Sequence, residues 1–249
     1  MERLKAIIQY DGTNYAGYQI QPNGNTVQAE LEKALSKMHK GRKVKVTASG
    51  RTDSGVHALG QVIHFDTDLN IPVENWKRAL SSMLPQDIYI LSVEQVGRDF
   101  HARYDAKGKE YRYFIWNDQE PNIFKRHYRY HIKADLDVAA MQQACKYIEG
   151  EHDFTSFCSP RTDIKGDKIR LIHEASVQKE GEELVFVFRG SGFLYNMVRI
   201  LVGTLVEVGR HDRDPGEIPM IIEAKEREAA GKTAPPQGLF LREVFYDED

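Results

Sequence analysis

Apolar and polar residues follow two different periods along this chain, and the periods predict where strands and helices lie. Apolar residues at every second position predict strands, and apolar residues at every third or fourth position predict helices. Over the first hundred residues the predicted order is strand, helix, strand, strand, helix, strand. In turn these are residues 5–11, a helix capped by Asn25 with Gln28 at the capping-box position, 44–49, 62–66, 74–84 and 88–96.

The remaining residues repeat this order of elements in outline without repeating the sequence. Strands are predicted at 104–116, 169–178, 184–190 and 239–246, and helices at 135–148, at 194–208 and from Pro215 toward Ala230. Two split βαβ units of this kind predict an α+β protein with two ferredoxin- or RRM-like halves, residues 1–100 and 101–249. We expect the halves to share a mixed, mainly antiparallel sheet, with helices packed on one face and a catalytic cleft on the other.

The composition is that of a globular protein without membrane-spanning segments. Of the 249 residues, 41% are hydrophobic and 29% are charged, and no apolar run is long enough to cross a bilayer. Residues 1–8 lead almost directly into a strand, so we expect no signal peptide. Cys145 and Cys158 have neither metal-binding spacing nor the pattern of a disulfide framework, and Cys145 falls on the apolar face of a predicted helix. We therefore expect a cytoplasmic protein that uses no metal and no organic cofactor.

The net charge of −3 does not by itself indicate a nucleic-acid partner, but the charge is unevenly distributed. Between Arg98 and Lys133 nine basic residues outnumber five acids, and aromatic residues are interleaved with them. A local basic patch, rather than the total charge, is what binds phosphate. Charge alone is equally compatible with a solvated pair of strands in this region.

The most concentrated group of polar side chains that could take part in chemistry lies at residues 48–58, between two predicted strands. The sequence there is Ala-Ser-Gly-Arg-Thr-Asp-Ser-Gly-Val-His-Ala. On turn chemistry alone this is a hairpin connection. Asp53 in it is a possible covalent nucleophile, which would need a cation to stay ionised where water is excluded. Arg199 lies in a segment that is apolar nearly all round and needs an anion if it is buried. We predict that the two residues pair; alternatively, Arg199 faces solvent or an RNA phosphate.

The string Gly-Arg-Thr-Asp-x-Gly-Val-His-Ala resembles the signature of the tRNA pseudouridine synthase A family. Further matches run from the first predicted strand to the last, so the resemblance covers the whole chain. One departure is Tyr18, where the family commonly has tryptophan. The matching segments are Asp11-Gly12-Thr13-x-Tyr15-x-Gly17-x-Gln19, Lys109-Glu110-Tyr111-Arg112-Tyr113, Asp153-Phe154-Thr155-Ser156-Phe157, Met197-Val198-Arg199-x-x-Val202-Gly203 and Gly238-Leu239-x-Leu241.

The resemblance implies an isomerase that converts uridine to pseudouridine at positions 38, 39 and 40 of the tRNA anticodon stem-loop. It implies that Asp53 is the nucleophile, and the sequence leaves attack at base C6 and at ribose C1′ both open. The base would be flipped out of its stack, with Tyr111 packed on it, Arg51 holding the base or its phosphate, and Arg199 near the substrate. It also implies a cytoplasmic homodimer in which both chains hold tRNA. Candidate RNA contacts are Tyr15, Gln19, Lys107 and Lys109.

Two other classes of function compete with this interpretation. A noncatalytic RNA-binding protein with RRM-like halves would explain the basic aromatic strand, but it gives Asp53 no role and the expected RNP1 spacing is absent. A hydrolase could use Ser54 and His57, but no nucleophile elbow accompanies them.

Overall fold

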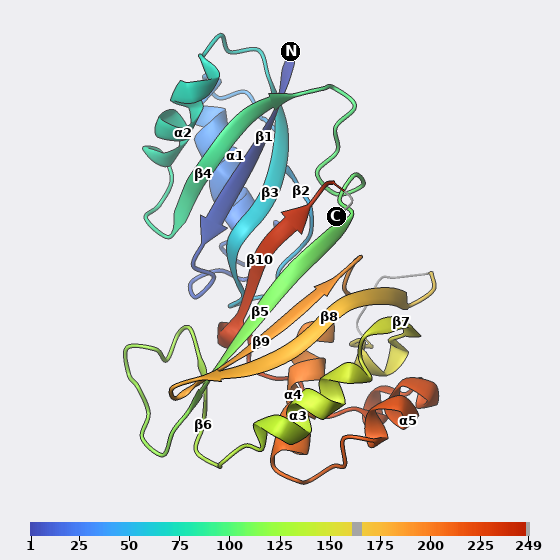
Figure 1. The fold of residues 1–249 in the computed structure, drawn as a ribbon. Helices are drawn as coiled ribbons and strands as arrows, with labels where there is room; N and C mark the ends of the chain where they lie inside the picture. Colours follow the sequence, from blue (N-terminus) through green and yellow to red (C-terminus); the bar gives the residue numbers. More distant parts are fainter. Residues whose placement is uncertain (161–165, 248–249) are drawn as a thin grey trace. The chain divides into compact units, whose positions relative to one another are not determined.

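The structure, a computed structural model, describes residues 1–160 and 166–247 and divides the chain into two compact units (Figure 1). The first unit comprises Met1–Lys107 together with the described residues from Phe240 onward, and the second comprises the described residues of Gly108–Leu239. Each unit combines helices with strands, and most neighbouring strands are antiparallel. The prediction of an α+β protein with mainly antiparallel strands is therefore confirmed.

Four strands of the first unit lie in the order β4, β1, β3, β10, and the short strand β2 pairs with β3. β1 is antiparallel to both of its neighbours, whereas β10 runs parallel to β3. The predicted order of strand, helix, strand, strand, helix, strand is confirmed for this part of the chain. The elements are β1 (Glu2–Tyr10), α1 (Val27–Met38), β2 (Thr47–Ala48), β3 (His57–Thr67), α2 (Val73–Ser81), β4 (Ile88–Val96) and β10 (Leu239–Phe245).

The core of the first unit follows from the alternation along β1. Leu4, Ala6 and Ile8 are completely buried, whereas the residues between them are partly exposed. On the same core, the ring of Phe65 from β3 lies 5.5 Å from that of Trp76 from α2, and both are about 1% exposed. This pair joins the helical layer to the sheet and positions the strands from which the candidate site is built.

The first helix begins one residue later than predicted. Thr26 is its N-cap, because its hydroxyl accepts a hydrogen bond from the Ala29 N–H at 3.4 Å, so the assignment of Asn25 as the cap was wrong. Asparagine and threonine are both good capping residues, and the sequence could not separate two in succession. Gln28 does not complete a capping box; its side-chain amide donates to the Val46 carbonyl.

The second unit has strands in the order β5, β9, β8, β7, with β6 parallel to β5 at the other side. The helix α3 packs against β8 and α4 (Figure 1). The elements are β5 (Gly108–Asn117), β6 (Tyr130–Ile132), α3 (Val138–Lys146), β7 (Gly150–Asp153), β8 (Ile169–Glu180), β9 (Glu183–Gly190), α4 (Met197–Gly209), α5 (Glu217–Ala224) and the 3₁₀ turns η1 (Thr155–Phe157), η2 (Arg227–Ala229) and η3 (Pro236–Gly238).

The second unit differs from the prediction in three ways. The strand predicted from residue 104 begins at Gly108, and the short strands β6 and β7 were not predicted. The helix predicted from Pro215 toward Ala230 ends at Ala224, because Lys225 takes the left-handed conformation with φ +52°. Nothing in the local residue pattern marks that ending, since lysine is a good helix former.

Two predictions about the core of the second unit are confirmed. α4 is buried all round, as its nearly continuous apolar sequence predicts, and only Arg199 and Glu207 along it are partly exposed. Cys145 on α3 is 1% exposed, and burial raises the pKa of its thiol to about 12. Cys145 is therefore a core residue and not a reactive thiol.

A buried histidine fixes the segment that follows β4 in the first unit. His64 on β3 is 6% exposed, and its Nδ1 accepts a hydrogen bond from the Ala102 N–H at 3.0 Å. Its ring meets those of Phe100 and His101 edge-on. Burial, with a smaller contribution from the Arg3 charge, lowers the pKa of His64 from 6.5 to about 4. The ring is therefore neutral in the folded protein at neutral pH.

Acidification should destabilise the protein through His64. Below pH 6.5 the unfolded chain binds a proton that the folded chain refuses until about pH 4, so the free energy of unfolding falls between these values. We expect a loss of roughly 2 kcal/mol from this residue between pH 7 and pH 5. Urea unfolding at the two pH values measures it. The variant His64→Gln, whose carbonyl can accept from Ala102 without titrating, should show a shallower pH dependence, and equal dependence would contradict the assignment.

Candidate active site

Asp53 lies in a turn that closes the antiparallel pair β2 and β3. The turn is anchored on one side by Gln61, whose amide donates to the Gly50 carbonyl at 3.0 Å and whose carbonyl accepts from the Ser49 hydroxyl at 2.7 Å. Within the turn, the Val56 N–H donates to the Asp53 carbonyl at 3.1 Å. Gln61 is completely buried, so the fixed point of the turn is in the core and the Asp53 side chain lies at its half-buried tip.

The loop between β1 and α1 packs directly on this turn. Backbone hydrogen bonds join the Tyr18 N–H to the Thr52 carbonyl at 3.0 Å and the Gly55 N–H to the Tyr15 carbonyl at 3.3 Å. The Ser54 hydroxyl donates to the same Tyr15 carbonyl at 3.2 Å. The residues on both sides of Asp53 are therefore held by main-chain groups of a second segment.

Two glycines allow the two segments to come this close. A Cβ on Gly12 would lie 2.0 Å from the Val56 carbonyl oxygen, which no side chain can occupy. Gly17 has φ +108°, a conformation that favours glycine, and a Cβ there would lie 2.9 Å from the Thr52 carbonyl oxygen. Both glycines belong to the first segment that matches the family. Each lacks a side chain at a point where the backbone of the loop touches the backbone of the turn.

His57 joins the ends of the two segments rather than facing a substrate. Its ring is 1% exposed, its Nδ1 accepts from the Gly12 N–H at 3.0 Å, and Asp11 Oδ1 lies 3.2 Å from the same nitrogen. The ring is stacked on Phe240 of β10 with centroids 4.5 Å apart. The hydrogen bonds of Ser54 and His57 go to different backbone groups, so this geometry does not assemble the serine–histidine pair that a hydrolase would use.

Three tyrosines support the loop and the turn from beneath. The Tyr10 hydroxyl shares a hydrogen bond with Thr52 Oγ1 at 2.7 Å, and the Tyr15 hydroxyl donates to Asp87 Oδ1 at 2.5 Å. Tyr15 is only 3% exposed, which leaves its ring little surface to offer RNA. Asp87 and Thr52 are supporting residues that sequence reasoning missed; Thr52 lay within the recognised string, but no pattern singled out Asp87.

The third tyrosine, Tyr18, is buried with an unsatisfied hydroxyl. Its hydroxyl oxygen has no hydrogen-bond partner among the described residues, and burial raises its pKa well above the usual value. An unsatisfied buried hydroxyl costs about 1–3 kcal/mol. The variant Tyr18→Phe should therefore unfold with a free energy about 1 kcal/mol higher than the wild type. Tyr10→Phe is the matched control, because it removes the bond to Thr52 and should lower that free energy; a loss in both variants would contradict the assignment.

Three further predicted site residues of the first unit are exposed. Arg51, at the start of the turn, and Gln19, in the loop that packs on it, both have exposed side chains. Lys107, at the end of the first unit, is also exposed, and its N–H donates to the Phe245 carbonyl at 2.8 Å. These positions leave the predicted contacts with RNA sterically open.

In the second unit, Tyr111 lies on β5 with its ring nearly buried. It is 8% exposed and meets the ring of Phe193 edge-on, with centroids 5.0 Å apart. Two residues along the strand, Tyr113 is completely buried and its hydroxyl donates to the Pro235 carbonyl at 2.7 Å, so it is a core residue. Lys109, at the start of the strand, is partly exposed. Phe193 beside Tyr111 was not predicted as a site residue.

Arg199 lies in the first half of α4 and is held by the chain around it. Its Nε donates to the Ala234 carbonyl at 2.8 Å and its Nη1 to Asn196 Oδ1 at 2.9 Å. One turn later, a Cβ on Gly203 would lie 1.6 Å from the Lys232 carbonyl oxygen, so that segment packs directly on the helix. These contacts fix the direction of the guanidinium; its pairing with Asp53 stays a prediction.

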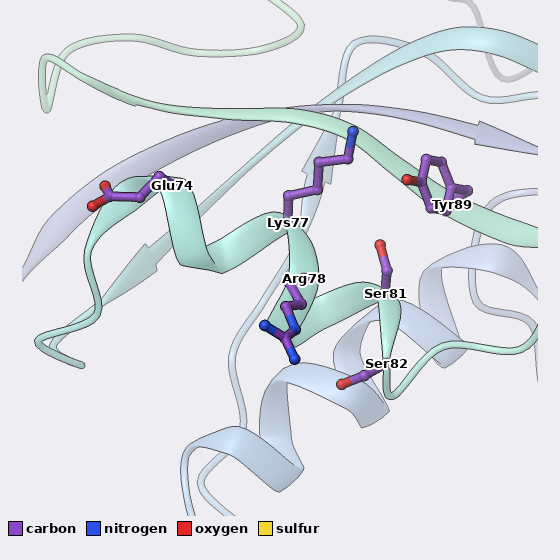
Figure 2. Close-up of a pocket in the computed structure, with 6 residues that line it drawn as sticks. All are labelled: Glu74, Lys77, Arg78, Ser81, Ser82 and Tyr89. Atoms are coloured by element: carbon purple, nitrogen blue, oxygen red, sulfur yellow. The ribbon is translucent and has the colours of Figure 1, made fainter.

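A shallow hollow of about 420 Å³ lies elsewhere on the first unit, between α2 and β4. Figure 2 shows Lys77 reaching from α2 toward Tyr89 on β4, and its Nζ lies 5.3 Å from the centre of that ring. The hollow shares no residue with the Asp53 turn. Its lining residues are Glu74, Lys77, Arg78, Ser81, Ser82 and Tyr89.

The described part of the chain contains neither a group of metal-ligating side chains nor a membrane-spanning helix. Within residues 1–160 and 166–247, no three histidine, cysteine, aspartate or glutamate side chains are grouped as metal ligands would be. In the same ranges, no helix has the length and apolar character needed to cross a bilayer.

A comparison with known protein families shows to which family this chain belongs. The family model described as tRNA pseudouridine synthase matches residues 6–105 and 144–247, which include the Asp53 turn and all of α4. The chain belongs to the tRNA pseudouridine synthase family. The resemblance noted in the sequence and the prediction of an isomerase are thereby confirmed.

Full-length relatives carry the same family name. A tRNA pseudouridine synthase A of Anoxybacillus flavithermus is 57% identical over 247 residues, which cover 99% of this chain and 100% of that protein. The tRNA pseudouridine synthase A of Oceanobacillus iheyensis is 52% identical over 249 residues, 100% of this chain and 98% of that protein. Among solved structures, a chain of a Cbf5-Nop10-Gar1 complex covers 82% of this chain and 54% of its own, with 13% identity and a TM-score of 0.34.

Proposed function

We propose that this protein isomerises uridine to pseudouridine at positions 38, 39 and 40 of the tRNA anticodon stem-loop, with Asp53 as the nucleophile. Membership of the family supports the reaction class and the tRNA substrate. The observation that carries the choice of residue is the attachment of the Asp53 turn to the β1–α1 loop, with hydrogen bonds at both Thr52 and Gly55. These bonds hold the residues on either side of Asp53 in one conformation, which a catalytic group requires.

The reaction exchanges one bond to the ribose for another. The N1–C1′ bond of uridine breaks, a C5–C1′ bond forms, the proton on C5 leaves and N1 takes up a proton, so the product has the composition of the substrate. Asp53 forms a transient covalent bond and is released unchanged, and both base C6 and ribose C1′ are compatible sites of attack. The step needs an ionised carboxylate, for which Arg199 is the proposed cationic partner because its guanidinium is held in a fixed direction.

The uridine must leave its stack before Asp53 can reach it, at a cost of a few kcal/mol. We assign to Tyr111 the packing of the flipped base, as the resemblance implies; the edge-on contact with Phe193 holds its ring in place. Arg51, exposed two residues before Asp53, is assigned to the extruded base or its phosphate. Gln19, Lys107 and Lys109 are proposed contacts to the RNA backbone, and Tyr15 is proposed to act through the loop it supports.

The enzyme is further proposed to act as a cytoplasmic homodimer, with both chains holding one tRNA. This part rests on the resemblance noted in the sequence. A dimer would also explain how a chain with a net charge of −3 binds a polyanion, because two copies can gather their basic residues in one groove.

Tritium release from tRNA tests the function. A tRNA transcript that carries 5-tritiated uridine should lose tritium to water when incubated with the wild-type protein, since C5 gives up its hydrogen. A transcript with cytidine at positions 38, 39 and 40 should release none. Tight binding without release would replace the proposal with a noncatalytic RNA-binding function, and release from the cytidine transcript would move the target to other uridines.

A further inference from the structure

A long loop in the second unit lies outside the segments that the family model matches. The chain leaves β5 at Asn117 and returns at Tyr130 as β6, which pairs with β5 in parallel. Parallel neighbours cannot be joined by a tight turn, so residues 118–129 form a crossover loop (Figure 1). We call residues 118–129 the crossover loop.

Hydrogen bonds fix the base of the crossover loop. The Asn117 side-chain amide donates to the carbonyls of Ile132 and Ala134 at 2.9 Å and 2.8 Å, and the Trp116 indole donates to the Glu120 carbonyl at 3.0 Å. The two ends are therefore tied together as the loop leaves the sheet.

Two cations of the crossover loop point inward and are fully engaged. Lys125 and Arg129 both form ion pairs with Glu183 of β9, the second at 3.0 Å between Arg129 Nε and the carboxylate. Lys125 also lies 4.4 Å from the centre of the Trp116 ring, and Arg129 lies 4.1 Å from that of Phe114. Burial alone would raise the pKa of Glu183, but the two cations outweigh it and lower that pKa. These contacts hold the loop in one conformation.

At the tip of the crossover loop, by contrast, large apolar side chains are exposed to solvent. Phe124 is 84% exposed and Ile123 is 61% exposed, beside the exposed side chains of Arg126 and His127. The loop is held by the ion pairs of Lys125 and Arg129, while its tip exposes a phenyl ring and a neighbouring arginine to water. Exposing an apolar ring has no benefit to folding, so we interpret the tip as a surface that binds a partner.

We propose that the tip of the crossover loop binds the tRNA substrate, with Phe124 stacked on an unpaired base and Arg126 on a neighbouring phosphate. The inference rests on the proposed tRNA function. Proteins recognise single-stranded RNA by stacking its bases on aromatic side chains, often beside arginine. The other candidate partner is a second copy of the chain, but two side chains are far from the roughly 800 Å² that each partner of a stable protein interface buries.

Filter-binding affinities for an unmodified tRNA transcript test the stacking. Phe124→Ala should raise Kd about tenfold, Phe124→Leu should raise it nearly as much, and Phe124→Trp should keep the wild-type value, because the aromatic face and not the apolar volume is what binds. Met220→Ala is the matched control, since Met220 is 60% exposed on α5 without aromatic or basic neighbours in sequence, and it should bind tRNA as the wild type does. With a blunt RNA duplex that has no unpaired base, Phe124→Ala should change nothing.

The phosphate contact is tested by salt dependence. Arg126→Gln should reduce the slope of log Kd against log salt by about one unit. A Phe124→Ala protein that binds tRNA as tightly as the wild type would overturn the inference, as would an equal loss of affinity for the blunt duplex. If Phe124→Ala instead changed the association state of the protein in sedimentation, relative to the wild type, the tip would be assigned to binding a second copy of the chain. These outcomes do not depend on tritium release, so a binding protein without turnover would refute the proposed function and leave this inference standing.

Discussion

The variant Asp53→Asn should bind tRNA with the wild-type Kd and lose turnover by at least about 10⁴-fold. Asparagine keeps the shape of the side chain, and the hydrogen bonds that hold the turn come from the neighbouring residues, so the turn should keep its place. What is lost is the anionic oxygen that forms the covalent bond, and a neutral amide cannot replace it. Tritium release and filter binding on the same protein preparation give both quantities.

Ser54→Ala is the matched control for Asp53→Asn. It removes a hydroxyl from the adjacent residue and costs a single hydrogen bond to the Tyr15 carbonyl, so turnover should stay within a few-fold of the wild type. The reverse result, with activity retained in Asp53→Asn and lost in Ser54→Ala, would favour the serine-based hydrolase. Loss of tRNA binding in Asp53→Asn would show that the residue holds the substrate rather than attacking it.

The second large effect is expected at a residue with no side chain. Gly12→Ala places a methyl group 2.0 Å from the Val56 carbonyl oxygen, so the loop and the turn must move apart. The Gly12 N–H is also the donor to His57, and that bond would be disturbed by the same movement. We expect turnover to fall by about 10²-fold, since a displacement of about 1 Å at a catalytic group has that effect. The free energy of unfolding should fall by about 1–3 kcal/mol.

Gly166→Ala separates this effect from glycine replacement in general. A Cβ on Gly166 has nothing within 4 Å and its backbone needs no unusual φ, so the variant should match the wild type in turnover and in urea midpoint. Single-turnover tritium release for Gly12→Ala at saturating tRNA isolates the chemical step. Wild-type turnover in Gly12→Ala would mean that the loop does not position Asp53.

The strands and helices with strong periodicity could be predicted, and the elements set by tertiary contacts could not. β4 follows from its alternating pattern, and α4 from its nearly continuous apolar run, to within a few residues. β6 has only three residues and forms because the crossover loop brings it beside β5. The end of α5 depends on one left-handed residue, Lys225, which no residue pattern announces.

The candidate site could likewise be predicted only in part. Asp53 could be found because its turn carries a long specific string of residues. The supports of the turn could not, because Tyr15, which accepts hydrogen bonds from it, and Asp87, which accepts one from Tyr15, are distant in sequence and meet only through the fold. Tyr15 illustrates the difference: sequence reasoning proposed an RNA contact, whereas its ring is buried and its hydroxyl is bound to Asp87. A residue type in a polar loop does not say which way the side chain points.

The parallel pairing of β10 with β3 has a consequence for biosynthesis. β10 is translated after the whole second unit, yet it completes the sheet of the first unit through Phe240 and Leu241, and Phe240 stacks on His57 at the end of the Asp53 turn. On the ribosome, the second unit can therefore finish folding from a contiguous stretch of nascent chain while the first still lacks a strand. Until β10 emerges, the start of β3 at His57 and Ala58 lacks its parallel partner. This is the period of synthesis in which a chaperone would have most to protect.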